Sequence, residues 1–374
     1  MSTPIITDVR WHAYRVPLRQ PMSTAHGLLE AREGAIIELV TDAGVTGIGE
    51  VVSVPEFGWQ HLRQMHDFFI GLADVAHGQT LKSIFEEVTT AAIQRRQPAP
   101  VFAGMEMAIL DALGKLQPCT VAELLTAHGV TPRVSVAVNA TIAVRHTNAA
   151  IAAALAAIAD GFTCIKLKVG IEAYPEDEIA RILALRTAIG PAVQLRLDAN
   201  EGWDATRAIA IMTACQAADI QYIEQPLPRD QVVEMAQLRG AGLVPIAADE
   251  AASDGAAIDH LINAQAADIY ILKPSLMGGL FATELMMQRV ASNGRLSVIT
   301  SAIETGVGVA AALHLAAATG RVELACGLAT LSLLEDDLLI DSLPIAFGHM
   351  AVPTGPGLGV SVDWEALARY EEHA

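Results

Sequence analysis

Charged side chains follow five short apolar segments in the second half of the chain. These segments end in Lys166-Leu-Lys168, Asp198-Ala-Asn200, Glu224-Gln-Pro226, Asp249-Glu250 and Lys273-Pro274. Three carboxylates on consecutive segments, without histidine or cysteine, are the hard oxygen donors that suit Mg²⁺, with Mn²⁺ as an alternative. Asp198, Glu224 and Asp249 are therefore candidate metal ligands, and lysines come before and after them in the chain.

Lys166 and Lys168 are separated by one residue, so both ammonium groups point to the same face of an extended segment. Two like charges near a divalent cation disfavour each other's protonation, so the second lysine can be a neutral amine near physiological pH. A neutral Lys168 beside a cation that holds a carboxylate could remove the proton α to that carboxylate while the enediolate is stabilised electrostatically. The alternative is a ring of salt bridges between these lysines and carboxylates.

The elements that carry these residues alternate between short β-branched segments and alanine-rich helical stretches beyond Pro132. Strands are expected at eight places, about 25 to 30 residues apart, which favours a (β/α)8-type barrel over an open sheet. The expected strands are Val134 to Asn139, Cys164 to Val169, Gln194 to Asp198, Tyr222 to Glu224, Pro245 to Asp249, Asp268 to Lys273, Ser297 to Thr300 and Val322 to Cys326. In such a barrel the polar residues at the carboxyl ends of the strands meet at one mouth.

The first part of the chain has a different pattern, typical of an α+β domain. Residues 5–16 and 35–41 alternate with period two, whereas Val101 to Leu116 follows a helical period. We expect a capping domain over 1–130, the barrel over 131–343, and a C-terminal segment, 344–374, that returns to the cap. The polar stretch Pro21 to Gly27 is expected to be a loop over the barrel mouth, with Met22 and His26 as substrate contacts, and an ordinary hairpin connection is the alternative.

Composition excludes several classes of protein. Of the 374 residues, 52% are hydrophobic and 18% charged, and the net charge is −18. A field of that sign repels nucleic acids and anionic membranes. No stretch is apolar enough to span a bilayer and no secretory signal is visible, so the cytoplasm is the expected compartment. The expected partner is a small carboxylate substrate, and a homo-oligomer is compatible with the sequence.

These motifs, in this order, resemble those of the enolase superfamily, muconate-lactonising subgroup, over nearly the whole chain. Strand seven, Ser297 to Thr300, offers no histidine, unlike the mandelate-racemase subgroup. The resemblance implies an α/β fold, a (β/α)8-type barrel with an N-terminal α+β capping domain. It also implies metal binding by the three carboxylates, Lys168 as the base, Lys166 as its modulator and Lys273 on the opposite face of the substrate.

Two later loops resemble those of o-succinylbenzoate synthases of menaquinone biosynthesis: Ser301 to Val309 and Ala325 to Ser332. This resemblance implies that Ser301 and Gly327 bind a succinyl carboxylate and that Glu304 lies near the enolate, with Asn200 a further substrate contact. The expected activity is a Mg²⁺-dependent dehydration. The alternatives are an N-acylamino-acid racemase, a dipeptide epimerase, another cycloisomerase, or a barrel that binds a metal or a carboxylate without catalysis.

Two further signals are given less weight. Gly306-Val-Gly-Val-Ala-Ala311 fits the dinucleotide fingerprint, but the ribose-binding acid is missing, so nucleotide binding is not expected. His314 is expected to be a packed residue, because its helical neighbours are alanines.

Overall fold

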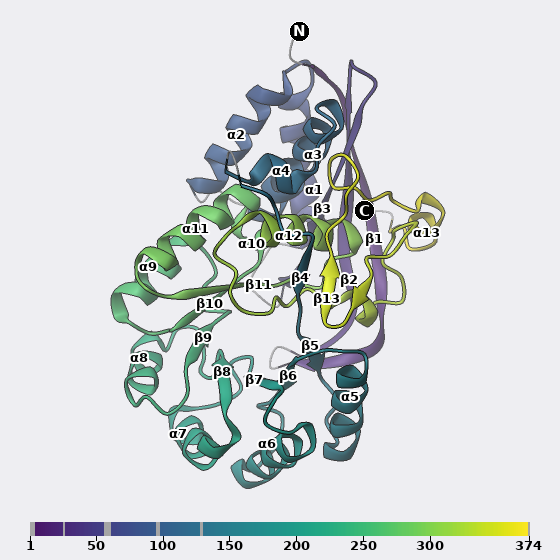
Figure 1. Ribbon diagram of the computed structural model, residues 1–374. Coiled ribbons are helices and arrows are strands. Elements are labelled where there is room, and N and C mark those ends of the chain that lie inside the picture. Colours follow the sequence, from purple (N-terminus) through teal and green to yellow (C-terminus); the bar gives the residue numbers. More distant parts are fainter. Residues whose placement is uncertain (1–3, 25–26, 56–60, 95–97, 128–129, 373–374) are drawn as a thin grey trace.

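The computed structural model describes residues 4–24, 27–55, 61–94, 98–127 and 130–372. Its N-terminal part is an antiparallel sheet in the order β1-β2-β3 with helices packed on one face (Figure 1). The elements are β1 (Ile6–Thr24), β2 (Gly27–Thr41), β3 (Thr46–Val52), α1 (Leu62–Ala76), α2 (Leu81–Ile93), α3 (Ala99–Leu116) and α4 (Val121–Leu125). We call this part the capping domain.

Helix α3 lies directly on strand β3, and two glycines allow this close approach. A Cβ atom on Gly47 would stand 2.0 Å from the carbonyl oxygen of Ala108, and one on Gly49 would stand 2.0 Å from that of Gly104. Because α3 is covered on several sides, its buried residues include the carboxylates Glu106 and Asp111.

The second part of the chain is a parallel sheet in the order β11-β10-β9-β8-β7-β6-β5, with helices around it (Figure 1). Its strands are β5 (Ala140–Ile142), β6 (Cys164–Lys168), β7 (Gln194–Asp198), β8 (Ile220–Glu224), β9 (Ile246–Ala248), β10 (Ile269–Leu272) and β11 (Leu296–Ile299). Its helices are α5 (Thr147–Ala159), α6 (Pro175–Ile189), α7 (Ala205–Ala214), α8 (Val232–Gly240), α9 (Gly255–Ala264), α10 (Pro274–Met277), α11 (Leu280–Ser292) and α12 (Gly306–Ala318).

Among the described residues, the barrel sheet has no regular eighth strand, so the expected strand Val322 to Cys326 is wrong in detail. Cys326 and Gly327 make isolated bridges, one to Val138 and one to Thr300. Two backbone carbonyl oxygens of this segment accept hydrogen bonds from arginine side chains instead of from a neighbouring strand. Arg133 donates to Val322 at 2.8 Å, and Arg196 donates to Ala325 at 2.7 Å.

The expected first barrel strand is also divided. Val134 to Asn139 contains only β4 (Ser135–Ala137), which pairs with β13 (His349–Ala351) in a separate small sheet that includes β12 (Ile345–Ala346). The barrel strand itself, β5, begins at Ala140. The period-two pattern thus predicted an extended segment but not the change of sheet within it.

The C-terminal residues lie beside strand β1 (Figure 1). The backbone of Arg15 donates to Tyr370 at 2.9 Å, and Glu372 donates to Ala13 at 3.2 Å. Helix α13 (Trp364–Arg369) comes directly before these residues in the chain. The domain limits at 130 and 343 stay predictions.

The expected loop over the barrel mouth is largely a strand. Strand β1 continues to Thr24 and β2 begins at Gly27, with Met22 opposite Leu29. Backbone pairing therefore extends almost to the tip of this hairpin, and His26 lies outside the described residues.

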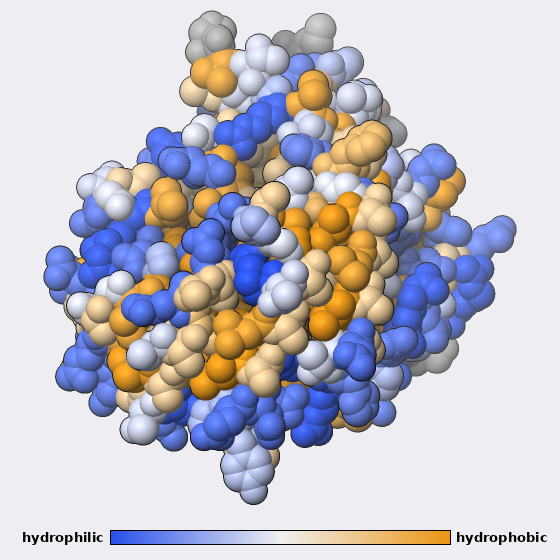
Figure 2. Space-filling view, turned by 60° about the horizontal axis from the view of Figure 1, so that its bottom comes forward, coloured by the Kyte–Doolittle hydropathy of each residue, from blue (hydrophilic) through white to orange (hydrophobic). Residues whose placement is uncertain are grey.

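Figure 2 shows a face on which apolar side chains form a band across the middle, with hydrophilic side chains around it. Helix α5 carries no charged residue and leaves Leu155 45% exposed. Assembly into a homo-oligomer stays a prediction. In the part of the chain that the structure describes, no helix has the length and apolar character needed to cross a membrane.

Candidate active site

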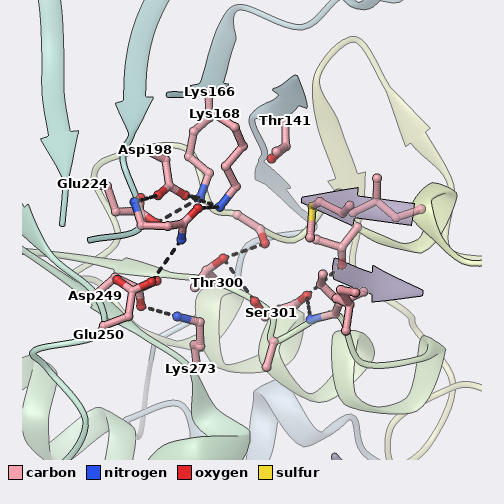
Figure 3. Close-up of a pocket in the computed structure, with 18 of the residues that line it drawn as sticks. Thr141, Lys166, Lys168, Asp198, Glu224, Asp249, Glu250, Lys273, Thr300 and Ser301 are labelled. Carbon is pink, nitrogen blue, oxygen red and sulfur yellow. Dashed lines mark hydrogen bonds and ion pairs between the residues drawn. The ribbon is translucent and has the colours of Figure 1, made fainter. Parts of the chain in front are cut away.

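A small cavity lies at the carboxyl ends of the barrel strands, beneath the β1-β2 hairpin (Figure 3). Its volume is about 90 Å³, and a larger cavity of about 550 Å³ adjoins it. The described residues that line the small cavity are Met22, Leu29, Arg32, Thr141, Lys166, Lys168, Asp198, Asn200, Glu224, Asp249, Glu250, Lys273, Thr300, Ser301, Ala302, Ile303, Gly327, Thr330 and Leu333.

The three predicted metal ligands all face this cavity and are buried. Asp198 ends β7 and is paired in register with Glu224, which ends β8, and Asp249 follows β9. Burial, together with the negative charge of Asp198, raises the pKa of Glu224 to about 7. Burial and the neighbouring Asp249 also raise the pKa of Glu250 to about 8. The cavity therefore gathers carboxyl groups that oppose one another's ionisation.

The three lysines neutralise part of that charge and approach from two sides. Lys166 Nζ lies 3.1 Å from an oxygen of Asp198 and 3.1 Å from one of Glu224. Lys168 Nζ lies 2.6 Å from Asp198, and Lys273 forms an ion pair with Asp249 from the opposite side (Figure 3). Lys168 also donates to the side-chain oxygen of Asn200 at 2.6 Å.

These ion pairs perturb the charged groups in opposite directions. Burial alone would raise the pKa of Asp198, but the ammonium groups of Lys168 and Lys166 lower it below its ordinary value. Burial would lower the pKa of Lys166, but the charges of Glu224 and Asp198 raise it well above its ordinary value. In the structure these lysines and carboxylates form salt bridges with one another. This is the arrangement that the sequence analysis gave as the alternative to a catalytic site.

A divalent cation fits this donor set chemically. Among the described residues, no three aspartate, glutamate, histidine or cysteine side chains are gathered closely enough to hold a metal as they stand. Burial, and after it the charges of Asp198 and Asp249, raises the pKa of Glu224, and a divalent cation would relieve the repulsion between these carboxylates. Asp198, Glu224 and Asp249 could hold Mg²⁺ after turning from the lysines toward a common point.

The remaining predicted residues divide into two groups. Met22, Asn200, Ser301 and Gly327 line the cavity, whereas Glu304 is not among the described residues that do. Glu304 lies in the loop after β11, where it accepts hydrogen bonds from Ser275 and from the backbone of Ala302.

Sequence reasoning missed several lining residues. Thr141 follows the expected first strand, so the rule of reading strand ends could have found it. Arg32, which donates to the carbonyl of Ser53 at 2.9 Å, comes from β2 and had no comparable signal.

The glycine-rich helix start is already occupied by a side chain of the capping domain. Glu50 of β3 accepts hydrogen bonds from the backbone of Thr305 at 2.8 Å and of Gly308 at 2.7 Å. Burial raises the pKa of Glu50 to about 7. The Glu50 carboxylate accepts hydrogen bonds from the N–H groups at the start of α12, which have no partner within the helix. The glycine-rich sequence at Gly306 therefore forms a contact between the two domains.

Comparisons with known protein families agree with this architecture. Residues 6–126 match "Mandelate racemase / muconate lactonizing enzyme, N-terminal domain", and residues 149–366 match "Enolase C-terminal domain-like".

Similar proteins have different activities. The chain is 37% identical to o-succinylbenzoate synthase of Thermobifida fusca (strain YX) over 193 residues, 51% of this chain and 59% of that protein. It is 26% identical to chloromuconate cycloisomerase CbnB of Cupriavidus necator, covering 96% of this chain and 97% of that one. It is also 26% identical to L-Ala-D/L-Glu epimerase of Bacillus subtilis (strain 168), covering 92% and 93%.

Solved structures are similar over almost the whole chain. Muconate lactonizing enzyme from Pseudomonas fluorescens, complexed with muconolactone, has a TM-score of 0.91 at 25% identity, covering 99% of this chain and 100% of that one. Dipeptide epimerase from Enterococcus faecalis V583, complexed with Mg and the dipeptide L-Leu-L-Tyr, has a TM-score of 0.87 at 25% identity, covering 96% and 99%. The predicted barrel with an N-terminal capping domain is confirmed, and the chain belongs to the enolase superfamily, in the mandelate racemase and muconate lactonizing enzyme group.

Proposed function

We propose that this protein is a Mg²⁺-dependent enzyme that removes the proton α to a carboxylate, and that its reaction is the dehydration that forms o-succinylbenzoate in menaquinone biosynthesis. One observation carries the proposal: carboxylates on three consecutive strand ends share a cavity with lysines on two opposite sides. The 37% identity to the Thermobifida fusca synthase over half the chain supports the specific reaction.

Different residues would carry out metal binding, proton transfer and charge stabilisation in this dehydration. Asp198, Glu224 and Asp249 would hold Mg²⁺, which when bound supplies a Lewis acid for the substrate carboxylate. Lys168, as a neutral amine, takes the α-proton, and the substrate becomes an enediolate. The resulting ammonium of Lys168 then returns a proton to the departing hydroxyl group, which leaves as water. Lys273 provides a fixed positive charge on the opposite face.

The rest of the cavity is suited to an organic substrate that carries a second polar group. Met22, Leu29 and Leu333 provide apolar surface. Ser301 Oγ lies 2.7 Å from the hydroxyl oxygen of Thr330, and Gly327 lines the same region. The resemblance to o-succinylbenzoate synthases makes Ser301 and Gly327 candidates for holding the succinyl carboxylate, and their place in the lining is compatible with that role.

A first test removes the metal site. Asp198→Asn, Glu224→Gln and Asp249→Asn are each expected to weaken Mg²⁺ binding and abolish turnover, because a charged oxygen donor is lost. Turnover is followed through the ultraviolet absorbance of the aromatic product, and Mg²⁺ affinity by calorimetry. Full activity of the wild-type protein in EDTA would refute the metal assignment, and no aromatic product would refute the synthase assignment.

Racemisation of N-acylamino acids, or epimerisation of dipeptides, is the second candidate. The observation that favours it is the placement of Lys168 and Lys273 on opposite sides of one cavity, since each could then exchange a proton with one face of the substrate. The 26% identity to the Bacillus subtilis epimerase over most of the chain supports it as well.

Lys273→Arg separates the two candidates. Dehydration uses Lys273 only as a positive charge, so part of the synthase activity should remain. Racemisation should vanish, because arginine does not give up its proton in proteins. Deuterium exchange at the α-carbon, measured for each enantiomer of an N-succinylamino acid, should survive only for the enantiomer whose hydrogen faces Lys168. Racemisation at the wild-type rate would exclude Lys273 as the second base.

A further inference from the structure

Lys273 stands at the start of a single helical turn, α10, that is fixed by a buried carboxylate. The carbonyl oxygen of Lys273 accepts hydrogen bonds from the backbone of Leu276 at 2.9 Å and of Met277 at 3.0 Å. These bonds tie the backbone of Lys273 to the rest of the turn. A displacement of this turn would therefore move the backbone from which the Lys273 side chain extends.

Ser275 in this turn donates a hydrogen bond to Glu304, which follows β11. The second carboxylate oxygen of Glu304 accepts from the backbone of Ala302 at 2.6 Å. Glu304 is 3% exposed and Ser275 is 1% exposed, so both groups are out of reach of bulk water. Burying a charged carboxylate is costly unless it is hydrogen-bonded, and both oxygens of Glu304 are hydrogen-bonded here.

Apolar contacts join the same segments. Val52 and Val54 of the capping domain form a small buried cluster with Leu276 of α10 and Ala302 of the loop after β11. The turn that begins at Lys273 is therefore held by a hydrogen bond on one side and by packing against the capping domain on the other.

Glu304 acts at one remove from the cavity. It is not among the described residues that line the small cavity, whereas Lys273 and Ala302 are. Glu304 links the loop after β11, which shapes the cavity, to the turn that carries Lys273. That Glu304 itself lies near the enolate stays a prediction.

We propose that Glu304 is a positioning residue that acts through Ser275 to hold Lys273 at the substrate. The proposal rests on the proposed function, because it assumes that Lys273 takes part in the reaction. It follows that the effects of substitutions at Ser275 and Lys273 on kcat should depend on each other. Removing the hydroxyl of Ser275 should lower kcat only when Lys273 is present.

The test is a double-mutant cycle between positions 275 and 273. Ser275→Ala is expected to lower kcat about tenfold with KM changed less than about twofold, since small misplacements of a reacting group are costly. In the Lys273→Ala background, the same substitution should lower kcat by less than about twofold. Equal losses in both backgrounds would overturn the proposal, because a general structural defect would act on either.

Ser297→Ala is a matched control. Ser297 lies in β11 and is 4% exposed, and in the described part of the chain its hydroxyl makes no hydrogen bond. Removing it is expected to leave kcat unchanged. If Ser275→Ala does not fold, Glu304→Gln takes its place in the cycle, because the amide keeps the shape and one acceptor oxygen.

A second measurement does not depend on the reaction. In a crystal structure of Ser275→Ala, the Nζ atom of Lys273 should be displaced from Asp249, whereas Lys168 should keep its contacts with Asp198 and Asn200. An unmoved Lys273 would overturn the positioning role whatever the activity of the protein. Failure of the proposed function would instead appear in the wild-type protein, as no turnover of either candidate substrate.

Discussion

The two lysine-bearing sides of the cavity are held in place by different parts of the molecule. On the Lys168 side the supporting groups belong to the barrel: Arg181 of α6 donates to the carbonyl of Lys168 at 2.8 Å, and Glu178 accepts from the backbone of Gly170 at 2.7 Å. On the Lys273 side the capping domain participates, since Glu106 of α3 accepts a hydrogen bond from Leu280, where α11 begins.

This difference suggests how one scaffold can accommodate several reactions. The backbone of Lys168 is held by its own barrel helix, whereas the turn that carries Lys273 packs against β3 and is followed by α11, which is bonded to α3. The larger cavity of about 550 Å³ also borders Lys168 and is not lined by Lys273 among the described residues. Changes in α3 can alter the Lys273 face through α11, whereas changes at the β1 residues that line the larger cavity, such as Met22, reach the Lys168 face.

The largest expected effect comes from removing the base on the barrel-supported side. Lys168→Ala should lower turnover about 10²- to 10⁴-fold, the usual contribution of general base catalysis, while Mg²⁺ affinity remains. Single-turnover kinetics and calorimetry measure the two quantities. Turnover close to the wild-type value would show that Lys168 is not the base. The Lys168 side would then not be the proton-abstracting side of the cavity.

Much of the barrel-supported side could be predicted from the sequence. The strand ends at Asp198 and Glu224 were predicted correctly, and the end at Lys168 was predicted one residue too late, at Val169. Parallel strands that are buried on both faces are short apolar segments that stop at polar residues. Period two also predicted correctly that Lys166 and Lys168 share one face, since both line the cavity.

The cap-supported side was much less predictable. Nothing in the local pattern indicates that Glu50 reaches Thr305, or that Glu106 reaches Leu280, because these contacts join residues far apart in the chain. The sequence also could not specify which lysine pairs with which carboxylate, since that depends on side-chain rotamers in a crowded cavity. Roles of individual residues in catalysis stay predictions.

The attachment of α11 to the cap predicts a stability change at alkaline pH. Burial raises the pKa of Glu106 from 4.5 to about 8. A raised carboxyl pKa means that the folded state prefers the protonated form, so this group's stabilising effect is full below about pH 4.5 and is lost as pH rises to about 8. At about 1.4 kcal/mol per pKa unit, the loss is several kcal/mol.

Glu106→Gln should remove this decline, because the amide is neutral at every pH in that range. Urea unfolding at pH 5 and pH 8 measures the free energy of unfolding of both proteins. Glu86→Gln, at an exposed position of α2, serves as the control. Parallel curves for wild type and Glu106→Gln would show that the carboxyl group does not titrate at this contact.

A second contact between cap and barrel predicts the opposite dependence. His314 of α12 accepts a hydrogen bond from the backbone of Ala122 at 3.2 Å, and its other ring nitrogen lies 2.9 Å from the carbonyl of Leu358. Burial lowers its pKa from 6.5 to about 4. The folded state thus prefers neutral His314, so its stabilising effect is full above about pH 6.5 and is lost as pH falls to about 4.

The expected loss is about 3 kcal/mol, at about 1.4 kcal/mol per pKa unit. His314→Gln should flatten the acid side of the stability curve, and His260→Gln, at an exposed position of α9, should not. Chemical unfolding at pH 4.5 and pH 7 is the measurement. An unchanged acid slope in His314→Gln would mean that this ring is not held neutral in the fold.

The smallest expected effect concerns the open, Lys168 side. Among the described residues that line the larger cavity, the charged side chains are Lys168 and Arg145, both cationic. Arg145 is 67% exposed and lies 3.9 Å from Glu172, so its charge is only partly balanced and is screened by water. A substrate with a second carboxylate would be attracted to this side, whereas a monocarboxylate would gain little.

Arg145→Gln should therefore raise KM about two- to threefold for a dicarboxylate substrate, within the range of exposed ion pairs, and less at high salt. KM for a monocarboxylate analogue should stay the same. Arg63→Gln makes the same charge change at an exposed position of α1 that lines neither cavity. It should leave KM unchanged for both substrates. If Arg145→Gln raised KM equally for both substrates, the effect would come from the shape of the cavity rather than its charge. The charge of Arg145 would then have no part in binding the second carboxylate, and Ser301 and Gly327 of the small cavity would remain its candidate contacts.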